Sequence, residues 1–138
     1  MVEAGVREQF TVMVALAGAD RRSLDTAAAI GTELVVQGLR PLLVRAGDAD
    51  TLAGVAGVVL VGAWGRPWAR AAASRFLHRH ATVLRVRPLW MVDAAPAGDG
   101  HPHPVPAPDL ELPVRLHTAG THGGREWAAG LAAAAVSR

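Results

Sequence analysis

Two short segments of this chain are apolar at nearly every position, and they constrain the fold more than any other feature. Residues 10–17 read FTVMVALA, and residues 57–61 read GVVLV. Each has the length of a β-strand, and continuous rather than alternating hydrophobicity indicates a strand buried on both faces. Such strands belong to parallel sheets whose two faces are covered by helices. The chain is therefore predicted to be an α/β protein.

The first predicted helix follows the first apolar strand and spans residues 24–37. Ser23 is expected to cap its start, with Asp25 in the favourable first turn, and Gly38 is expected to end it at the C′ position. Apolar residues recur at helical spacing along it, which predicts a face packed on the sheet: Leu24, Ala27, Ala28, Ile30, Leu34 and Val35.

The second predicted helix spans residues 69–80 and has Pro67 near its first position, where proline is tolerated. Its apolar stripe predicts that Trp68, Ala72, Phe76 and Leu77 face the sheet. Three further strands are predicted at residues 40–45, 88–92 and 114–117, and an alanine-rich closing helix at residues 126–136.

The order of these elements predicts one domain over residues 10–138, preceded by an N-terminal extension at residues 1–9. Residues 94–113 contain prolines at 96, 102, 104, 106, 108 and 113, and they are expected to form an extended loop.

Composition excludes several classes of function. The chain has no cysteine, so disulfides and thiolate chemistry are excluded. All 14 basic residues are arginine, and the net charge is only +2, without the basic cluster that a nucleic-acid partner requires. No apolar run reaches the ~20 residues of a membrane span, and the N-terminus has no apolar signal region. A cytoplasmic location is therefore expected.

In an open parallel sheet, ligands bind outside the carboxyl ends of the strands, near the point where the strand order reverses. This rule selects three loops, at residues 18–23, 62–68 and 93–103. No Gly-x-Gly-x-x-Gly fingerprint and no nucleophilic serine motif occurs in them. His101 and His103 supply too few ligands for a zinc site. We therefore predict neither a catalytic triad nor a metal site.

The sequence resembles the flavodoxin-domain family, in particular proteins similar to menaquinone-dependent protoporphyrinogen oxidase. The resemblance covers roughly residues 10–96 and rests on VMVALAGADRRSLDTAAAIGTELVVQGLRPLLVR, AGVVLVGAWGRPWARAAASRFLHRH and RPLWMVDAAP. It implies a flavodoxin-like three-layer sandwich with a parallel, five-stranded sheet, and it implies FMN as the cofactor.

In that family the first loop is rich in hydroxyls and glycine, and it surrounds the FMN phosphate at a helix N-terminus. The matching residues here are Gly18, Ala19, Asp20, Arg21, Arg22 and Ser23. Ser23 is the one hydroxyl that remains among them, and Asp20 adds a negative charge. Arg21 and Arg22 are candidates to replace the hydroxyls as phosphate partners.

The second and third family loops line the flavin ring, and the resemblance assigns them here to Gly62, Ala63, Trp64 and Gly65 and to Asp93 and Ala94. Trp64 is the candidate for stacking on the isoalloxazine, or alternatively an indole that covers the end of the sheet. Trp68 is expected to be a core residue. Asp93 either lies at the flavin edge or simply ends its strand.

Two hypotheses of function remain open. One is a small FMN protein that passes electrons to a quinone or a redox partner, acting as an FMN-dependent oxidoreductase if it is an enzyme. The other is a degenerate flavodoxin-like domain without cofactor, which acts as a binding or oligomerisation module. The alanine-rich segment at residues 126–136 is a candidate face for a homodimer.

Overall fold

Parallel strands form the centre of the computed structural model, which describes residues 10–94, 106, 110 and 114–118. The strands are β1 (Thr11–Leu16), β2 (Arg40–Arg45), β3 (Val55–Gly62), β4 (Leu89–Asp93) and β5 (Val114–Thr118). They lie in the order β2-β1-β3-β4-β5, and each neighbouring pair is parallel. The predicted five-stranded parallel sheet is confirmed, and its order reverses between β1 and β3.

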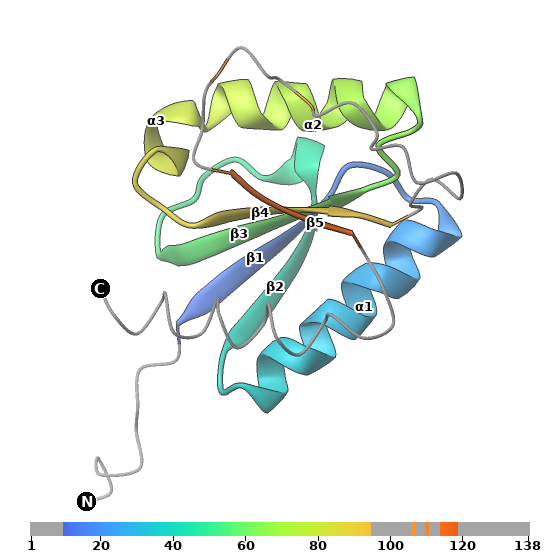
Figure 1. The fold of residues 1–138 in the computed structure, drawn as a ribbon. Helices are drawn as coiled ribbons and strands as arrows, with labels where there is room; N and C mark the ends of the chain where they lie inside the picture. Colours follow the sequence, from blue (N-terminus) through green and yellow to red (C-terminus); the bar gives the residue numbers. More distant parts are fainter. Residues whose placement is uncertain (1–9, 95–105, 107–109, 111–113, 119–138) are drawn as a thin grey trace, which may run out of the picture.

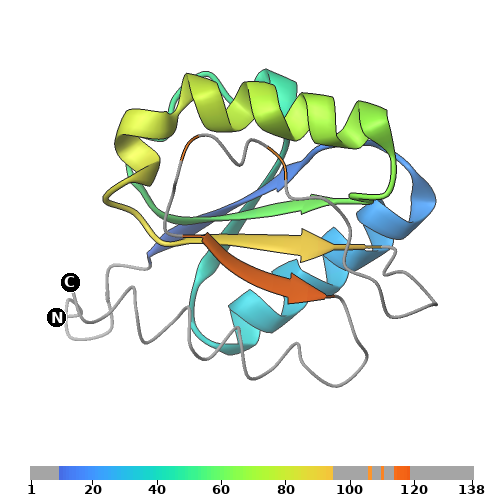
Figure 2. The same ribbon diagram turned by 45° about the horizontal axis from the view of Figure 1, so that its top comes forward.

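Helices cover both faces of this sheet, as Figures 1 and 2 show. Helix α1 (Arg21–Val36) lies on one face. Helix α2 (Pro67–Arg79), the short helix α3 (Ala81–Leu84) and the 3-10 turn η2 (Ala46–Asp48) lie on the other. The predicted three-layer sandwich is therefore confirmed.

Strands β1 and β3 are buried on both faces, which explains their continuous apolar sequence. In β3, Val59 and Val61 belong to the core on the α1 side, whereas Val58 and Leu60 belong to the core on the α2 side. All four side chains have no exposed surface. Successive side chains of such a strand point to opposite faces of the sheet. Because both faces are packed against helices, both sets of side chains are apolar.

Helix α1 begins earlier than predicted, and a different residue caps it. Asp20 is the N-cap, and Ser23 lies inside the first turn, so the prediction of Ser23 as the cap is wrong. Asp25 consequently lies beyond the first turn, contrary to expectation. Leu24 and Val35, expected on the packed face, are 44% and 59% exposed. Gly38 has a φ of 82°, which confirms its predicted place after the helix.

Strand β2 forms one edge of the sheet, and a proline blocks that edge. The Arg40 N–H donates to the Phe10 carbonyl at 2.9 Å, so the backbone of Arg40 faces β1. Because backbone groups alternate along a strand, Pro41 faces the open edge with no N–H to donate. This arrangement disfavours pairing of β2 with another strand.

Several predictions fall outside the described residues: the extension at 1–9, most of the 94–113 loop with His101 and His103, and the closing helix at 126–136. Within the described part of the chain, none of the helices combines the length and apolar character needed to cross a membrane.

Candidate functional site

The three predicted loops meet at the carboxyl edge of the sheet, as far as each is described. The Ala17 N–H after β1 donates to the Val61 carbonyl at 2.9 Å. The Ala94 N–H after β4 donates to the Gly62 carbonyl at 3.0 Å, which joins the second and third loops. The sequence therefore predicted correctly which segments lie side by side.

The first loop is organised around the carboxylate of Asp20. Its Oδ2 accepts the Ser23 N–H at 3.2 Å, and its Oδ1 accepts the Ser23 hydroxyl at 2.8 Å. The Asp20 carbonyl also accepts the Leu24 N–H at 3.0 Å, which closes the first helical turn. Ser23 itself has no exposed surface. Both hydrogen-bond donors of Ser23 are thus bonded to a carboxylate of the same chain.

Trp68 lies against the first loop rather than in the core. Its side chain is 48% exposed, so the prediction of a core position is wrong. Its ring lies so close to Gly18 that a Cβ there would stand 2.6 Å from the Trp68 Cη2. Trp68 follows the proline that begins α2, and both residues are exposed at this end of the helix.

Trp64, the candidate for flavin stacking, is buried at 4% exposure and belongs to the core on the α2 side. A Cβ on Gly62 would stand 2.5 Å from its Cζ3, so the indole packs directly on the strand end. Within the part of the chain that the structure describes, the buried Trp64 Nε1 has no hydrogen-bond partner. This placement matches the alternative that the sequence left open, an indole that covers the end of the sheet.

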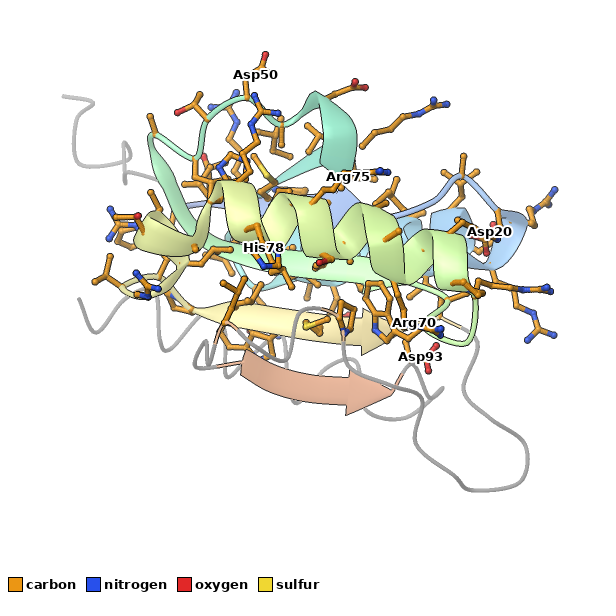
Figure 3. The ribbon with its side chains drawn as sticks, turned by 90° about the horizontal axis from the view of Figure 1, so that it is seen from above. Asp20, Asp50, Arg70, Arg75, His78 and Asp93 are labelled. Atoms are coloured by element: carbon orange, nitrogen blue, oxygen red, sulfur yellow. The ribbon has the colours of Figure 1, made fainter. Side chains whose placement is uncertain are left out.

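The main chain at Trp64 is fixed from two sides. Its N–H donates to the Asp93 Oδ1 at 3.4 Å, and its carbonyl accepts from the Arg70 Nη1 at 2.6 Å. Figure 3 shows Arg70 and Asp93 at the same end of the sheet. Asp93 is only 5% exposed. It ends β4, and its carboxylate also holds the main chain of Trp64. Arg70 was not predicted, because a surface arginine on a helix gives no sequence signal of such a contact.

The two arginines of the first loop lie on the surface. Arg21 donates from Nε to the Asp25 Oδ2 at 3.3 Å, and their side chains are 89% and 69% exposed. Arg22 is also exposed. Ala19 and Gly65 are exposed at the loop tips, and Ala63 is buried. Among the residues that the structure describes, no group of His, Asp and Glu has the arrangement of a metal site.

No family model matches the chain, and no curated protein matches it significantly. Solved structures do match it. An archaeal flavodoxin aligns over 92% of this chain and 99% of its own, with a TM-score of 0.63 at 10% identity. A diflavin flavoprotein A3 from Nostoc sp. aligns over 95% of this chain and 94% of its own, with a TM-score of 0.56 at 15% identity. The chain has a flavodoxin-like fold.

The same fold occurs within a larger enzyme. The constitutive lysine decarboxylase of E. coli matches 93% of this chain, with a TM-score of 0.57 at 10% identity, but only 17% of the decarboxylase chain is covered. Because these identities are low, the likeness establishes the fold of this flavodoxin-like domain alone.

The described loop residues do not fit the FMN phosphate in the arrangement that the family resemblance implies. The Asp20 carboxylate already bonds the donors of Ser23, and it would repel a second anion. The Trp68 ring rests on Gly18 and would have to move aside before a ligand could approach the backbone there. Arg21 is directed to Asp25 on the helix surface. At the N-terminus of α1, where the family resemblance places the FMN phosphate, the Asp20 carboxylate bonds both donors of Ser23.

Removing this cap is expected to destabilise the domain. Asp20→Ala should lower the free energy of unfolding by about 2 kcal/mol, because α1 loses its N-cap and the buried Ser23 hydroxyl loses its acceptor. Asp20→Asn is the matched control: its one amide oxygen still accepts the Ser23 N–H, and its NH2 can donate to the Ser23 hydroxyl oxygen, so its cost should be smaller, at about 1 kcal/mol. Urea denaturation followed by circular dichroism measures both. Equal losses in the two variants would contradict the capping role.

Proposed function

We propose that this flavodoxin-like domain works without FMN and serves as a protein-binding module. The observation that carries the proposal is the Asp20 carboxylate, which accepts both hydrogen bonds of Ser23 at 3.2 and 2.8 Å. An anion bound in this loop would have to displace that carboxylate. The proposal concerns the carboxyl edge of the sheet, where the three loops meet.

Electrostatics supports the absence of a phosphate ligand. A phosphate monoester carries a charge of about −1.5 to −2 at pH 7. To replace Asp20 it would have to reach Ser23, which has no exposed surface, while the negative charge of Asp20 remained nearby. The neighbouring Arg21 offers little compensation, because its side chain is 89% exposed and water screens its charge.

The surface around Trp68 has the composition of a binding site for another protein. Trp68 is 48% exposed, and Arg66 and Pro67 beside it are exposed as well. Tryptophan and arginine are the residue types that most often dominate the energy of protein interfaces. A partner suited to this surface would present an apolar recess to the indole and an acidic group to Arg66.

The alternative function is that of an FMN-dependent electron carrier acting on a quinone or a redox partner, as the resemblance to proteins of the menaquinone-dependent protoporphyrinogen oxidase type implies. Two observations favour it: the likeness to a flavodoxin and a diflavin flavoprotein, and the half-exposed indole of Trp68 at the carboxyl edge. Gly62, Gly65 and Asp93 would then border the flavin ring, and the flavin would supply the redox chemistry. This alternative ranks second because of Asp20.

Titration with FMN separates the two functions. The purified wild-type protein is expected to be colourless and to give no saturable quenching of FMN fluorescence up to about 100 µM, which corresponds to a binding free energy weaker than roughly −5.5 kcal/mol. Asp20→Asn retains the helix cap and removes the charge, so any gain of FMN binding in this variant identifies the carboxylate as the obstacle. Flavin absorption bands in the wild-type protein as purified would overturn the proposal.

Analytical ultracentrifugation tests whether the partner of this surface is a second copy of the chain. If the protein self-associates through Trp68, the variant Trp68→Ala should be monomeric at concentrations where the wild type is a dimer. If both are monomeric, self-association through this surface is excluded, and its partner must be sought among other proteins. A dimer that persists in Trp68→Ala would place self-association on another surface.

A further inference from the structure

The connection between β2 and β3 leaves part of the sheet without a long helix. Residues 46–54 make this connection with the 3-10 turn η2 and a loop. Ala46, Ala49 and Leu52 from this connection join the core on the α2 side, so the turn packs down beside α2. A short turn fills less space than a helix, and a hollow remains next to it.

This hollow is a cavity of about 310 Å³ between η2 and α2, lined by Ala46, Gly47, Ala72, Arg75, Phe76 and Arg79. Its volume lies at the lower end of the range for small-molecule sites. Figure 3 shows Arg75 on the side of α2 near η2, away from Asp20 and Asp93. The cavity is therefore separate from the edge of the sheet where the three loops meet.

The cavity is apolar at its base and cationic at its rim. Ala46 and Phe76 are 3% and 2% exposed, and they form the apolar base. The guanidinium groups of Arg75 and Arg79 come from exposed side chains at the rim. A Cβ added to Gly47 would meet no heavy atom within 4 Å, which leaves that side of the cavity open.

The two arginines differ in their ionic partners. The Arg79 Nη2 lies 3.1 Å from the Asp50 Oδ1. Arg75 has no ionic partner within the described part of the chain. The two like charges are four residues apart on one helix, a spacing at which they repel. One additional negative charge at the rim would balance Arg75 and reduce this repulsion.

We infer that this cavity binds a small organic carboxylate with an apolar body. The carboxylate would pair with the Arg75 guanidinium, whose planar donors suit a bidentate contact, and the apolar body would lie on Ala46, Ala72 and Phe76. One negative charge satisfies the one unpaired arginine. The inference does not depend on the proposed function, because the cavity shares no residue with the loops at the carboxyl edge.

Benzoate is a suitable probe, and benzamide is its neutral counterpart of the same shape. Titrating the full ¹⁵N-labelled chain with benzoate should shift the amide signals of Gly47, Ala72 and Phe76 in a saturable manner, with a dissociation constant on the order of 1 mM or tighter. Benzamide should bind at least tenfold more weakly. Inorganic phosphate, which lacks the apolar body, should also bind more weakly than benzoate.

Two variants locate the site. Arg75→Gln should weaken benzoate binding at least tenfold, whereas Arg85→Gln, an exposed arginine that does not line the cavity, should leave it unchanged. Ala72→Leu should reduce binding by filling the cavity while both charges stay in place, with the amide spectrum as the check that the variant is folded. Non-saturable shifts, equal binding of benzamide, or equal effects of Arg75→Gln and Arg85→Gln would overturn the inference.

Discussion

Replacing Gly62 with alanine is expected to destabilise the domain by about 3 kcal/mol, because the added methyl group enters a fully packed region. The new Cβ would lie 2.5 Å from the Trp64 Cζ3 and 3.1 Å from the Ala17 Cβ. Trp64 is only 4% exposed, and its main chain is fixed by Asp93 and Arg70. The indole has no solvent to move into, so the end of β3 must shift. Urea denaturation at neutral pH measures the loss.

Gly18→Ala is the matched control for this prediction. Its Cβ would overlap an indole even more closely, with the Trp68 Cζ3 nearest and the Cη2 at 2.6 Å. Trp68 is 48% exposed, however, so its ring can swing into solvent at the cost of one contact. The expected loss is below about 1 kcal/mol, a value usual for surface contacts. A larger loss in Gly18→Ala than in Gly62→Ala would contradict the assignment of Trp64 as the confined indole and Trp68 as the half-exposed one that can move aside.

These two tryptophans separate what the sequence predicts, which is the secondary structure and its order, from what it does not predict, which is the burial of single side chains at the strand ends. The strands were predictable because burial on both faces leaves a continuous apolar run, as in β1 and β3. The helices were predictable from apolar spacing and from Pro67 and Gly38 at their ends. The meeting of the three loops followed from the parallel order of strands. The strands and helices follow from the spacing of apolar residues along the chain, and the meeting of the loops follows from the order of the strands.

The orientation of single side chains at the strand ends depends on something else. Trp64 follows the end of β3 and packs on Gly62, whereas Trp68 lies in the first turn of α2, packs on Gly18 and is 48% exposed. The helical stripe predicted a core position for Trp68, because spacing along a helix does not show that this residue packs on the first loop instead of on the sheet. Likewise, both Asp20 and Ser23 are suitable N-caps, and only the backbone path shows that Asp20 occupies that position.

The same fold does not require the same ligand. This domain shares its topology with a flavodoxin and with part of a lysine decarboxylase, at identities of 10% in both cases. Function in such sheets is determined by the loops at the strand ends. Here the Asp20 carboxylate bonds both donors of Ser23 in the first loop, and this contact carries our proposal that the domain works without FMN.

A second large effect is expected from His80→Ala, at about 3 kcal/mol of lost stability, because the change removes both a buried hydrogen bond and a buried ring. His80 is 7% exposed, and its Nε2 donates to the Ala49 carbonyl at 2.8 Å. Its ring centroid lies 4.9 Å from that of Phe76. His80 thereby joins the end of α2 to the connection between β2 and β3, so the amides of residues 46–54 should also exchange faster with solvent.

His78→Ala is the control on the same helix. His78 is exposed, and its Nδ1 contacts the Ser74 carbonyl of its own turn at 2.8 Å, so the expected loss is smaller than that of His80→Ala. His80→Phe separates the two contributions, because a phenyl ring retains the packing on Phe76 but cannot donate to Ala49. It should recover about half of the loss, leaving the cost of one unpaired buried carbonyl at roughly 1–2 kcal/mol. If His80→Phe is as stable as the wild type, the hydrogen bond to Ala49 contributes nothing, and packing alone fixes this connection to the domain.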